Sequence, residues 1–110
     1  MEKIIFVDHH QNRIIELPKT LQERQKLVGA DCLDVLRLPN NIDIWFDDEG
    51  AFKEHEFSSV IVTPNGDVHQ IPGTYFVASV NDKTETIGLT QEQIIYFCNR
   101  IGYKAWKNQK

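Results

Sequence analysis

The chain has 110 residues, of which 41% are hydrophobic, and a formal net charge of -4 from 16 acidic and 12 basic residues. This length supports one hydrophobic core, and this hydrophobic share excludes a wholly disordered protein. The charge balance excludes a strongly basic nucleic-acid binder and also a DNA mimic, which needs far more acid, so we expect no direct binding to nucleic acid.

Two short β-rich runs open the chain at residues 3–7 and 13–17, and the polar residues between them predict an amino-terminal hairpin. The first run is too short for a signal peptide or a membrane span, so we expect a cytoplasmic protein with no membrane contact. Thr20 and Glu23 then form a capping-box pattern, which predicts a short helix that stops at Gly29.

A second hairpin is predicted further along the chain. Residues 32–38 and 42–47 alternate between apolar and polar side chains, and the turn between them is Pro-Asn-Asn. This period of two predicts an antiparallel strand pair. An acidic turn at residues 48–50 follows, and residues 51–52 are expected to return along the sheet.

Residues 71–80 are predicted to form one long strand, and the Pro72-Gly73 pair near its start indicates a bulge or an edge position. Because an open edge can pair with another chain, we expect this strand to join two copies in a homodimer. Thr90 and Gln93 repeat the capping-box pattern ahead of a second helix, which is expected to stop at Gly102.

The two cysteines, Cys32 and Cys98, show neither a redox motif nor a zinc-binding spacing. They predict two buried, reduced thiols; the alternative is a single disulfide in an exported protein. The second helix is expected to bury one apolar stripe, formed by Ile94, Ile95, Cys98 and Ile101.

These elements predict the α+β class: a single domain over residues 1–110, with a mostly antiparallel sheet of four to six strands and two helices. We expect a buried core that includes Ile4, Phe6, Leu27, Val28, Leu36, Ile44, Phe76, Ile94, Cys98 and Ile101.

The densest group of candidate functional residues is acidic: Asp43, Asp47, Asp48 and Glu49. Paired carboxylates can act as general acid and base or hold a magnesium ion, and Asp47 with Glu49 is the pair to which an enzyme hypothesis points. No histidine, lysine or nucleophile accompanies them locally. The cluster therefore favours contact with a partner, and we expect no catalytic residue, metal or cofactor.

A small-ligand site is the alternative. Arg37, Asn40, Asn41 and Trp45 could meet around a nucleotide, with Trp45 stacking on the base and Arg37 pairing with a phosphate. The competing interpretation is that Arg37 pairs with a cross-strand acid such as Asp43.

The motifs LVGADCLDVLRLP, DDEG, IPGTYFVAS and LTQEQI occur in this order at residues 27–39, 47–50, 71–79 and 89–94. Their order resembles the family catalogued as domain of unknown function 3846, over roughly residues 21–101. The resemblance implies a small accessory protein of bacteria, phages or plasmids, and it brings no catalytic residues.

Two hypotheses follow for the function. The first is a non-catalytic binding protein of a phage or mobile element, acting in the cytoplasm of a bacterial host cell by masking a host or defence-system protein, including a nuclease effector. The second is a protein that binds a small molecule or nucleotide, as a sensor or as a sponge for a signalling molecule.

Overall fold

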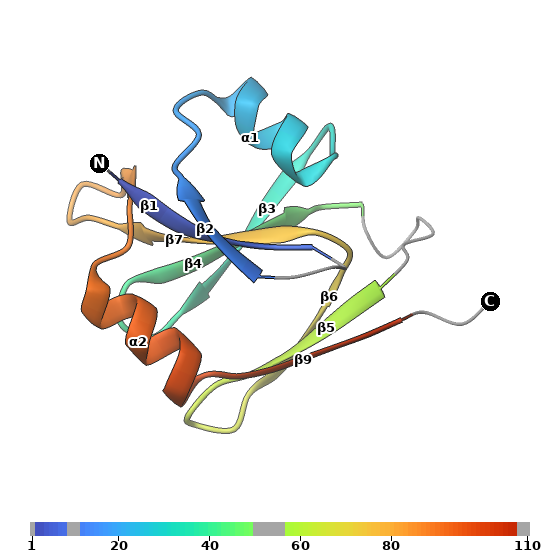
Figure 1. The fold of residues 1–110 in the computed structure, drawn as a ribbon, viewed down its shortest axis with the longest axis vertical. Helices are drawn as coiled ribbons and strands as arrows, with labels where there is room; N and C mark the ends of the chain where they lie inside the picture. Colours follow the sequence, from blue (N-terminus) through green and yellow to red (C-terminus); the bar gives the residue numbers. More distant parts are fainter. Residues whose placement is uncertain (1, 9–11, 50–56, 108–110) are drawn as a thin grey trace.

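A computed structural model describes residues 2–8, 12–49 and 57–107. The described residues form two helices and a set of short strands, which confirms the predicted α+β class (Figure 1). In chain order the elements are β1 (Lys3–Val7), β2 (Asn12–Glu16), α1 (Leu21–Val28), β3 (Leu33–Leu38), β4 (Ile42–Asp47), β5 (Phe57–Val62), β6 (Val68–Pro72), β7 (Tyr75–Val80), β8 (Thr86–Ile87), α2 (Gln91–Arg100) and β9 (Gly102–Lys107).

The strands form two sheets, which we call the large sheet and the small sheet. The large sheet has six strands, ordered β2-β1-β7-β4-β3 with β8 also paired to β7, and the small sheet has three, ordered β6-β5-β9. The observed pairings are antiparallel, as predicted. Helix α1 lies over one face of the large sheet, whereas α2 and the small sheet lie on the other (Figure 1).

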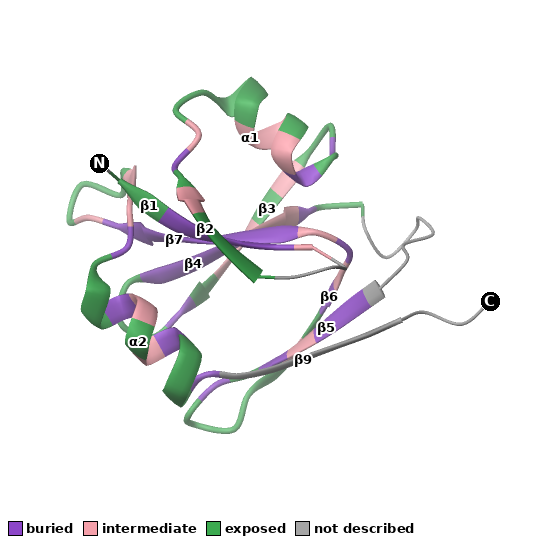
Figure 2. Cartoon of the chain, viewed as in Figure 1, coloured by how far each residue is buried: buried purple, intermediate pink, exposed green. Residues whose placement is uncertain are grey.

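Each face of the large sheet carries its own hydrophobic core, because successive side chains of a strand point to opposite faces. The central strand β7 is buried along its whole length (Figure 2). On the α1 face, Ile4, Phe6 and Phe76 pack with Val28 of α1. The opposite face supplies the larger core, which also includes side chains from α2 and the small sheet; its buried members are Ile5, Val7, Leu38, Ile42, Ile44, Ile61, Ile71, Tyr75, Val77, Leu89, Phe97 and Ile101.

Local sequence signals explain the helix starts and the hairpin turn. The Thr20 side chain accepts a hydrogen bond from the Glu23 N–H, and Gly29 ends α1 in the left-handed conformation with φ 80°. Both hydrogen bonds of the predicted capping box are present at the start of α2. Asn40 and Asn41, which tolerate positive φ better than most residues, adopt φ values of 68° and 59° in the β3–β4 turn.

The prediction of one long strand over residues 71–80 is wrong. Pro72 ends β6 in the small sheet, Gly73 has φ 78°, and the chain then begins β7 in the large sheet. Strand β7 lies between β1 and β4, so it is central and cannot pair with a second copy. The apolar run is continuous because Ile71 near the end of β6 and all six residues of β7 are buried, and a glycine that tolerates positive φ allows the change of sheet.

Several predictions about burial also need correction. Cys32 and Cys98 are both exposed free thiols, and Ile95 is 51% exposed. The stripe of α2 that faces the core is narrower than predicted and centres on Phe97, which is fully buried. Leu27, Leu36 and Ile94 are only partly buried beside the cores; the other predicted core residues, Ile4, Phe6, Val28, Ile44, Phe76 and Ile101, are buried as expected.

The end of α2 differs from the prediction as well. Ile101 takes an extended conformation and Gly102 begins β9, so the chain passes directly from the helix into the small sheet without a left-handed cap. The expected return of residues 51–52 along the sheet lies outside the described residues. Among the helices described, neither is long and apolar enough to cross a membrane.

Candidate functional site

The candidate residues lie on the β3–β4 hairpin and the turn after it. The register pairs Arg37 with Asp43, Val35 with Trp45 and Leu33 with Asp47. Because Trp45 packs in the core beneath α1, the residues two positions away on β4, Asp43 and Asp47, also lie on that face. Asp43 and Asp47 therefore lie on the α1 face of the large sheet, and both are buried.

Arg37 and Asp43 form a cross-strand ion pair, as the competing interpretation proposed. The Arg37 Nε donates to Asp43 Oδ1 at 2.9 Å and its Nη2 to Oδ2 at 3.4 Å. The Asp43 side chain is 5% exposed and that of Arg37 is 61% exposed. The guanidinium therefore neutralises a buried carboxylate while its outer edge still faces solvent.

Trp45 belongs to a row of aromatic side chains that crosses the large sheet. Phe6 is paired with Phe76, and Phe76 with Trp45. The rings of Trp45 and Phe76 stack, with centroids 5.6 Å apart and planes 6° from parallel, and the Arg24 guanidinium lies 5.3 Å from the Trp45 ring centroid. The ring is thus already in contact with Phe76 and a cation, which leaves it a packing role.

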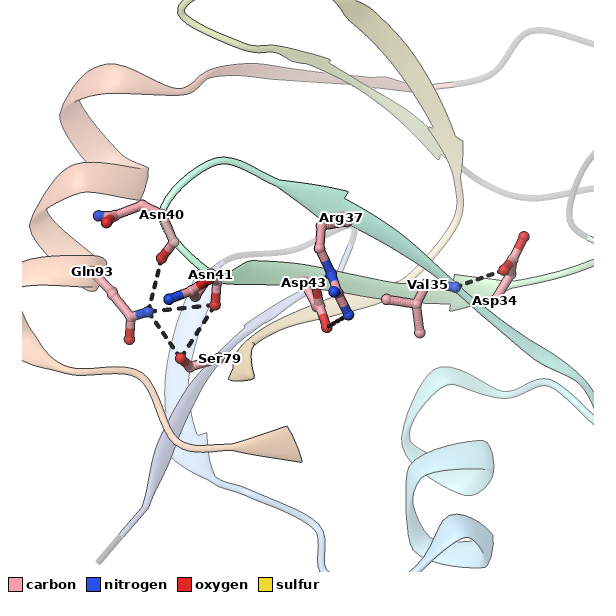
Figure 3. A network of polar contacts seen from close by, with 8 residues as sticks. All are labelled: Asp34, Val35, Arg37, Asn40, Asn41, Asp43, Ser79 and Gln93. Carbon is pink, nitrogen blue, oxygen red and sulfur yellow. Dashed lines mark hydrogen bonds and ion pairs between the residues drawn. The ribbon is translucent and has the colours of Figure 1, made fainter. Parts of the chain in front are cut away.

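Asn40 and Asn41 occupy the other end of the hairpin, where α2 meets the sheet (Figure 3). The Gln93 Nε2 donates to the carbonyl of Asn40 at 3.1 Å, to that of Asn41 at 3.4 Å and to the Ser79 hydroxyl at 2.8 Å. The Ser79 hydroxyl in turn donates to the Asn41 carbonyl at 3.2 Å. Figure 3 shows this network apart from the Arg37–Asp43 pair, so the four residues of the predicted nucleotide site do not form one cluster.

The acidic turn is organised by Asp47. Its Oδ1 accepts the Glu49 N–H at 2.9 Å, and its side chain is buried. Asp48 and Glu49 are exposed. Within the described ranges, no group of three histidine, cysteine or acidic side chains is placed to hold a metal ion.

Two contributors to the hairpin were not identified as site residues from the sequence. Gln93 was expected as a helix cap, but its second role joins residues 53 positions apart. No local sequence pattern indicates the contact of Arg24 with Trp45, because the guanidinium reaches the ring only when α1 packs on the sheet. Asp34, which was not singled out either, accepts the neighbouring Val35 N–H through Oδ1 at 2.8 Å.

Comparison with known families gives one match. The model of the family described as domain of unknown function DUF3846 matches residues 1–102. The chain belongs to the DUF3846 family. The DUF3846 match covers the large sheet, both helices, β5 and β6, and it reaches the first residue of β9. Neither the curated proteins nor the solved structures include a match to this DUF3846 chain.

Proposed function

We propose that this DUF3846 protein is a non-catalytic binding protein of a phage or mobile element. It acts in the cytoplasm of a bacterial host cell by masking a host or defence-system protein, with a nuclease effector as one such target. The contact surface is the β3–β4 hairpin and its acidic turn, through Arg37, Asn40, Asn41, Asp48 and Glu49. These residues are all exposed.

The observation that carries this proposal is the anchoring of the hairpin. Gln93 and Ser79 bind the carbonyls of its turn, Trp45 stacks on Phe76 of the neighbouring strand, and Arg37 joins its two strands through Asp43. A surface held in one geometry loses little conformational entropy on binding, which favours affinity for a macromolecular partner.

The burial and hydrogen bonding of two candidate carboxylates support a non-catalytic role. The enzyme hypothesis relied on Asp47 and Glu49, but Asp47 is buried and its Oδ1 accepts the Glu49 N–H. Asp43 is likewise buried and bonded to Arg37. A general base or metal ligand must reach its substrate or ion with a lone pair that is open to it.

The mixture of charges at the surface supports a protein partner. Arg37 presents a cation that already has a carboxylate beside it, and the exposed acids Asp48 and Glu49 follow at the end of β4. Charges of both signs around a fixed hairpin suit a partner with a complementary pattern, and such patterns determine specificity and the rate of association.

The proposal is tested by affinity capture with the purified protein from lysates of the bacterial host, with and without induced phage defence. We expect one stoichiometric protein partner, whose capture falls at least tenfold for Glu49→Lys and is unchanged for Glu2→Lys. Both glutamates are exposed, and Glu2 precedes β1, two strands away from the hairpin in the large sheet. Absence of a stoichiometric partner, or equal loss with both variants, would contradict the proposal.

A thermal-shift screen against nucleotides addresses the alternative directly. A ligand present at about 100 times its dissociation constant stabilises the fold by roughly 2.7 kcal/mol, which is readily visible as a rise in Tm. We expect no shift. A shift that Arg37→Met removes would replace the masking function with nucleotide binding.

A further inference from the structure

Strand β2 forms one edge of the large sheet. Within the described part of the chain it pairs only with β1, and its burial pattern is the most open of the large sheet, with four of its five residues exposed. Ile14 at its centre is 56% exposed, so a large apolar side chain lies in solvent at this open edge.

The backbone N–H and C=O of Ile14 point away from β1, toward the open edge of the large sheet. In an antiparallel pair, alternate residues of an edge strand direct both N–H and C=O either toward the neighbouring strand or away from it. The Leu17 N–H donates to the Glu2 carbonyl at 3.0 Å, so Leu17, Ile15 and Arg13 face β1. Ile14 and Glu16 alternate with these residues and therefore direct their backbone groups outward.

At the opposite edge of the large sheet, β3, a side chain occupies an outward-facing backbone donor. The Asp48 N–H donates to the Cys32 carbonyl at 3.0 Å, and the same alternation directs the Val35 backbone outward. There the Asp34 carboxylate accepts the Val35 N–H at 2.8 Å (Figure 3). A side chain that occupies an outward donor blocks the addition of another strand. At Ile14, by contrast, an outward backbone is combined with an exposed apolar side chain.

We propose that β2 pairs antiparallel with β2 of a second copy, around a two-fold axis at Ile14. A two-fold axis perpendicular to the sheet sets one residue opposite its own copy, so the residue on the axis defines the register. With Ile14 on the axis, the two Ile14 backbones exchange both hydrogen bonds, and the two exposed side chains bury each other.

A β2–β2 pair with its axis at Arg13, Ile15 or Glu16 would be less stable. An axis at Arg13 or at Glu16 sets like charges directly opposite each other, which destabilises a strand pair. An axis at Ile15 leaves Ile14 opposite a glutamate and shifts the strand toward Pro18, which has no N–H to donate. With Ile14 on the axis, Arg13 faces Ile15 of the other copy and all five residues of β2 fall within the paired segment.

Strand pairing of this length gives a small interface, at the low end of the range for specific complexes, and we expect a weak dimer that dissociates on dilution. The resulting dimer carries one continuous sheet across the two-fold axis. The proposal leaves the β3–β4 hairpin at the far edge of each copy, so it is independent of the masking function.

The test is the molar mass by sedimentation equilibrium or light scattering from about 10 to 500 µM, a range suited to a weak, transient interface. We expect the mass to rise from 12.8 kDa toward twice that value. Ile14→Arg should stay monomeric, because it sets two cations opposite each other, and Val68→Arg should associate like the wild type. Val68 is 64% exposed on the edge strand of the small sheet, which makes it a matched control.

A disulfide test addresses the register itself. Residues opposite each other in a hydrogen-bonded antiparallel pair have Cα atoms about 5.5 Å apart, which a disulfide can span. In a protein carrying Cys32→Ser and Cys98→Ser, Ile14→Cys should form a covalent dimer on mild oxidation, at least tenfold faster than Val68→Cys. A monomer over the whole concentration range, association that survives Ile14→Arg, or equal cross-linking of the two cysteine variants would each overturn the proposal.

Discussion

Ser79 and Ser59 are two of the buried serines of the sheets, and their hydroxyls differ in hydrogen bonding. Ser79 on β7 accepts from Gln93 at 2.8 Å and donates to the Asn41 carbonyl at 3.2 Å. Ser59 on β5 is fully buried, and among the described residues its Oγ has no hydrogen-bond partner. Burial without a partner removes a hydroxyl from water without compensation.

Substitution by alanine should therefore destabilise the protein at Ser79 and not at Ser59. Ser79→Ala breaks two hydrogen bonds and should lower the free energy of unfolding by about 1–3 kcal/mol. Ser59→Ala removes only an uncompensated polar atom and should leave stability unchanged or raise it by up to about 1 kcal/mol. Urea unfolding of the two variants measures the difference, and equal destabilisation would contradict the assignment of the Ser79 network.

At the scale of elements, Gln93 holds α2 and the hairpin together by two separate functions. Its Oε1 accepts the Thr90 N–H at 2.9 Å as part of the capping box, and its Nε2 donates to the hairpin turn. Glutamate at this position keeps the acceptor but replaces the donor with a charge that faces carbonyl oxygens. Leucine removes both functions and leaves an apolar side chain.

We expect Gln93→Leu to lower the free energy of unfolding by about 1–3 kcal/mol, from the lost cap and the lost hydrogen bonds to the Asn40 carbonyl and the Ser79 hydroxyl. Gln93→Glu should lower it by more at neutral pH, because it places a carboxylate against the carbonyl oxygens of the turn, which cannot donate to it. Gln91→Leu, an exposed position in the same turn of the helix, should change it by less than about 0.5 kcal/mol. Chemical denaturation ranks the three variants, and a Gln93→Glu variant as stable as the wild type would show that Nε2 is not needed.

The elements that were predictable from sequence are those with local causes. The α1 cap, the capping box of α2 and the Asn40–Asn41 turn each depend on residues within a few positions. The Arg37–Asp43 pair followed from the strand register alone. The Gln93 network and the contact of Arg24 with Trp45 depend on how helices pack on the sheet, which no local pattern specifies.

The small sheet escaped prediction for the same reason at a larger scale. Ile71 of β6 is buried like the residues of β7, so the apolar pattern of residues 71–80 did not distinguish a change of sheet at Gly73 from a local irregularity of one strand. The class of fold could be inferred, since it needs only the types of element. Their division between two sheets depends on tertiary pairing.

The whole molecule is held together by the larger core, which the two sheets share. Ile44 and Val77 from the large sheet lie in the same buried cluster as Ile61 and Ile71 from the small sheet. Because neither sheet can bury this surface without the other, we expect the two to unfold in a single cooperative transition. Ile61 is fully buried on the central strand of the small sheet, so it is the position at which to test this coupling.

Ile61→Ala should lower the free energy of unfolding by about 2–5 kcal/mol, the range for removing a large aliphatic side chain from a core and leaving a cavity. Val68→Ala on the exposed edge of the small sheet should change it by less than about 0.5 kcal/mol. Amide hydrogen exchange of Ile61→Ala should show protection falling by the same factor in β5 and in β7, because the large sheet loses its packing partner when the small sheet opens. If exchange accelerated in β5 while β7 kept wild-type protection, the small sheet would open on its own, and the two sheets would not share one cooperative core.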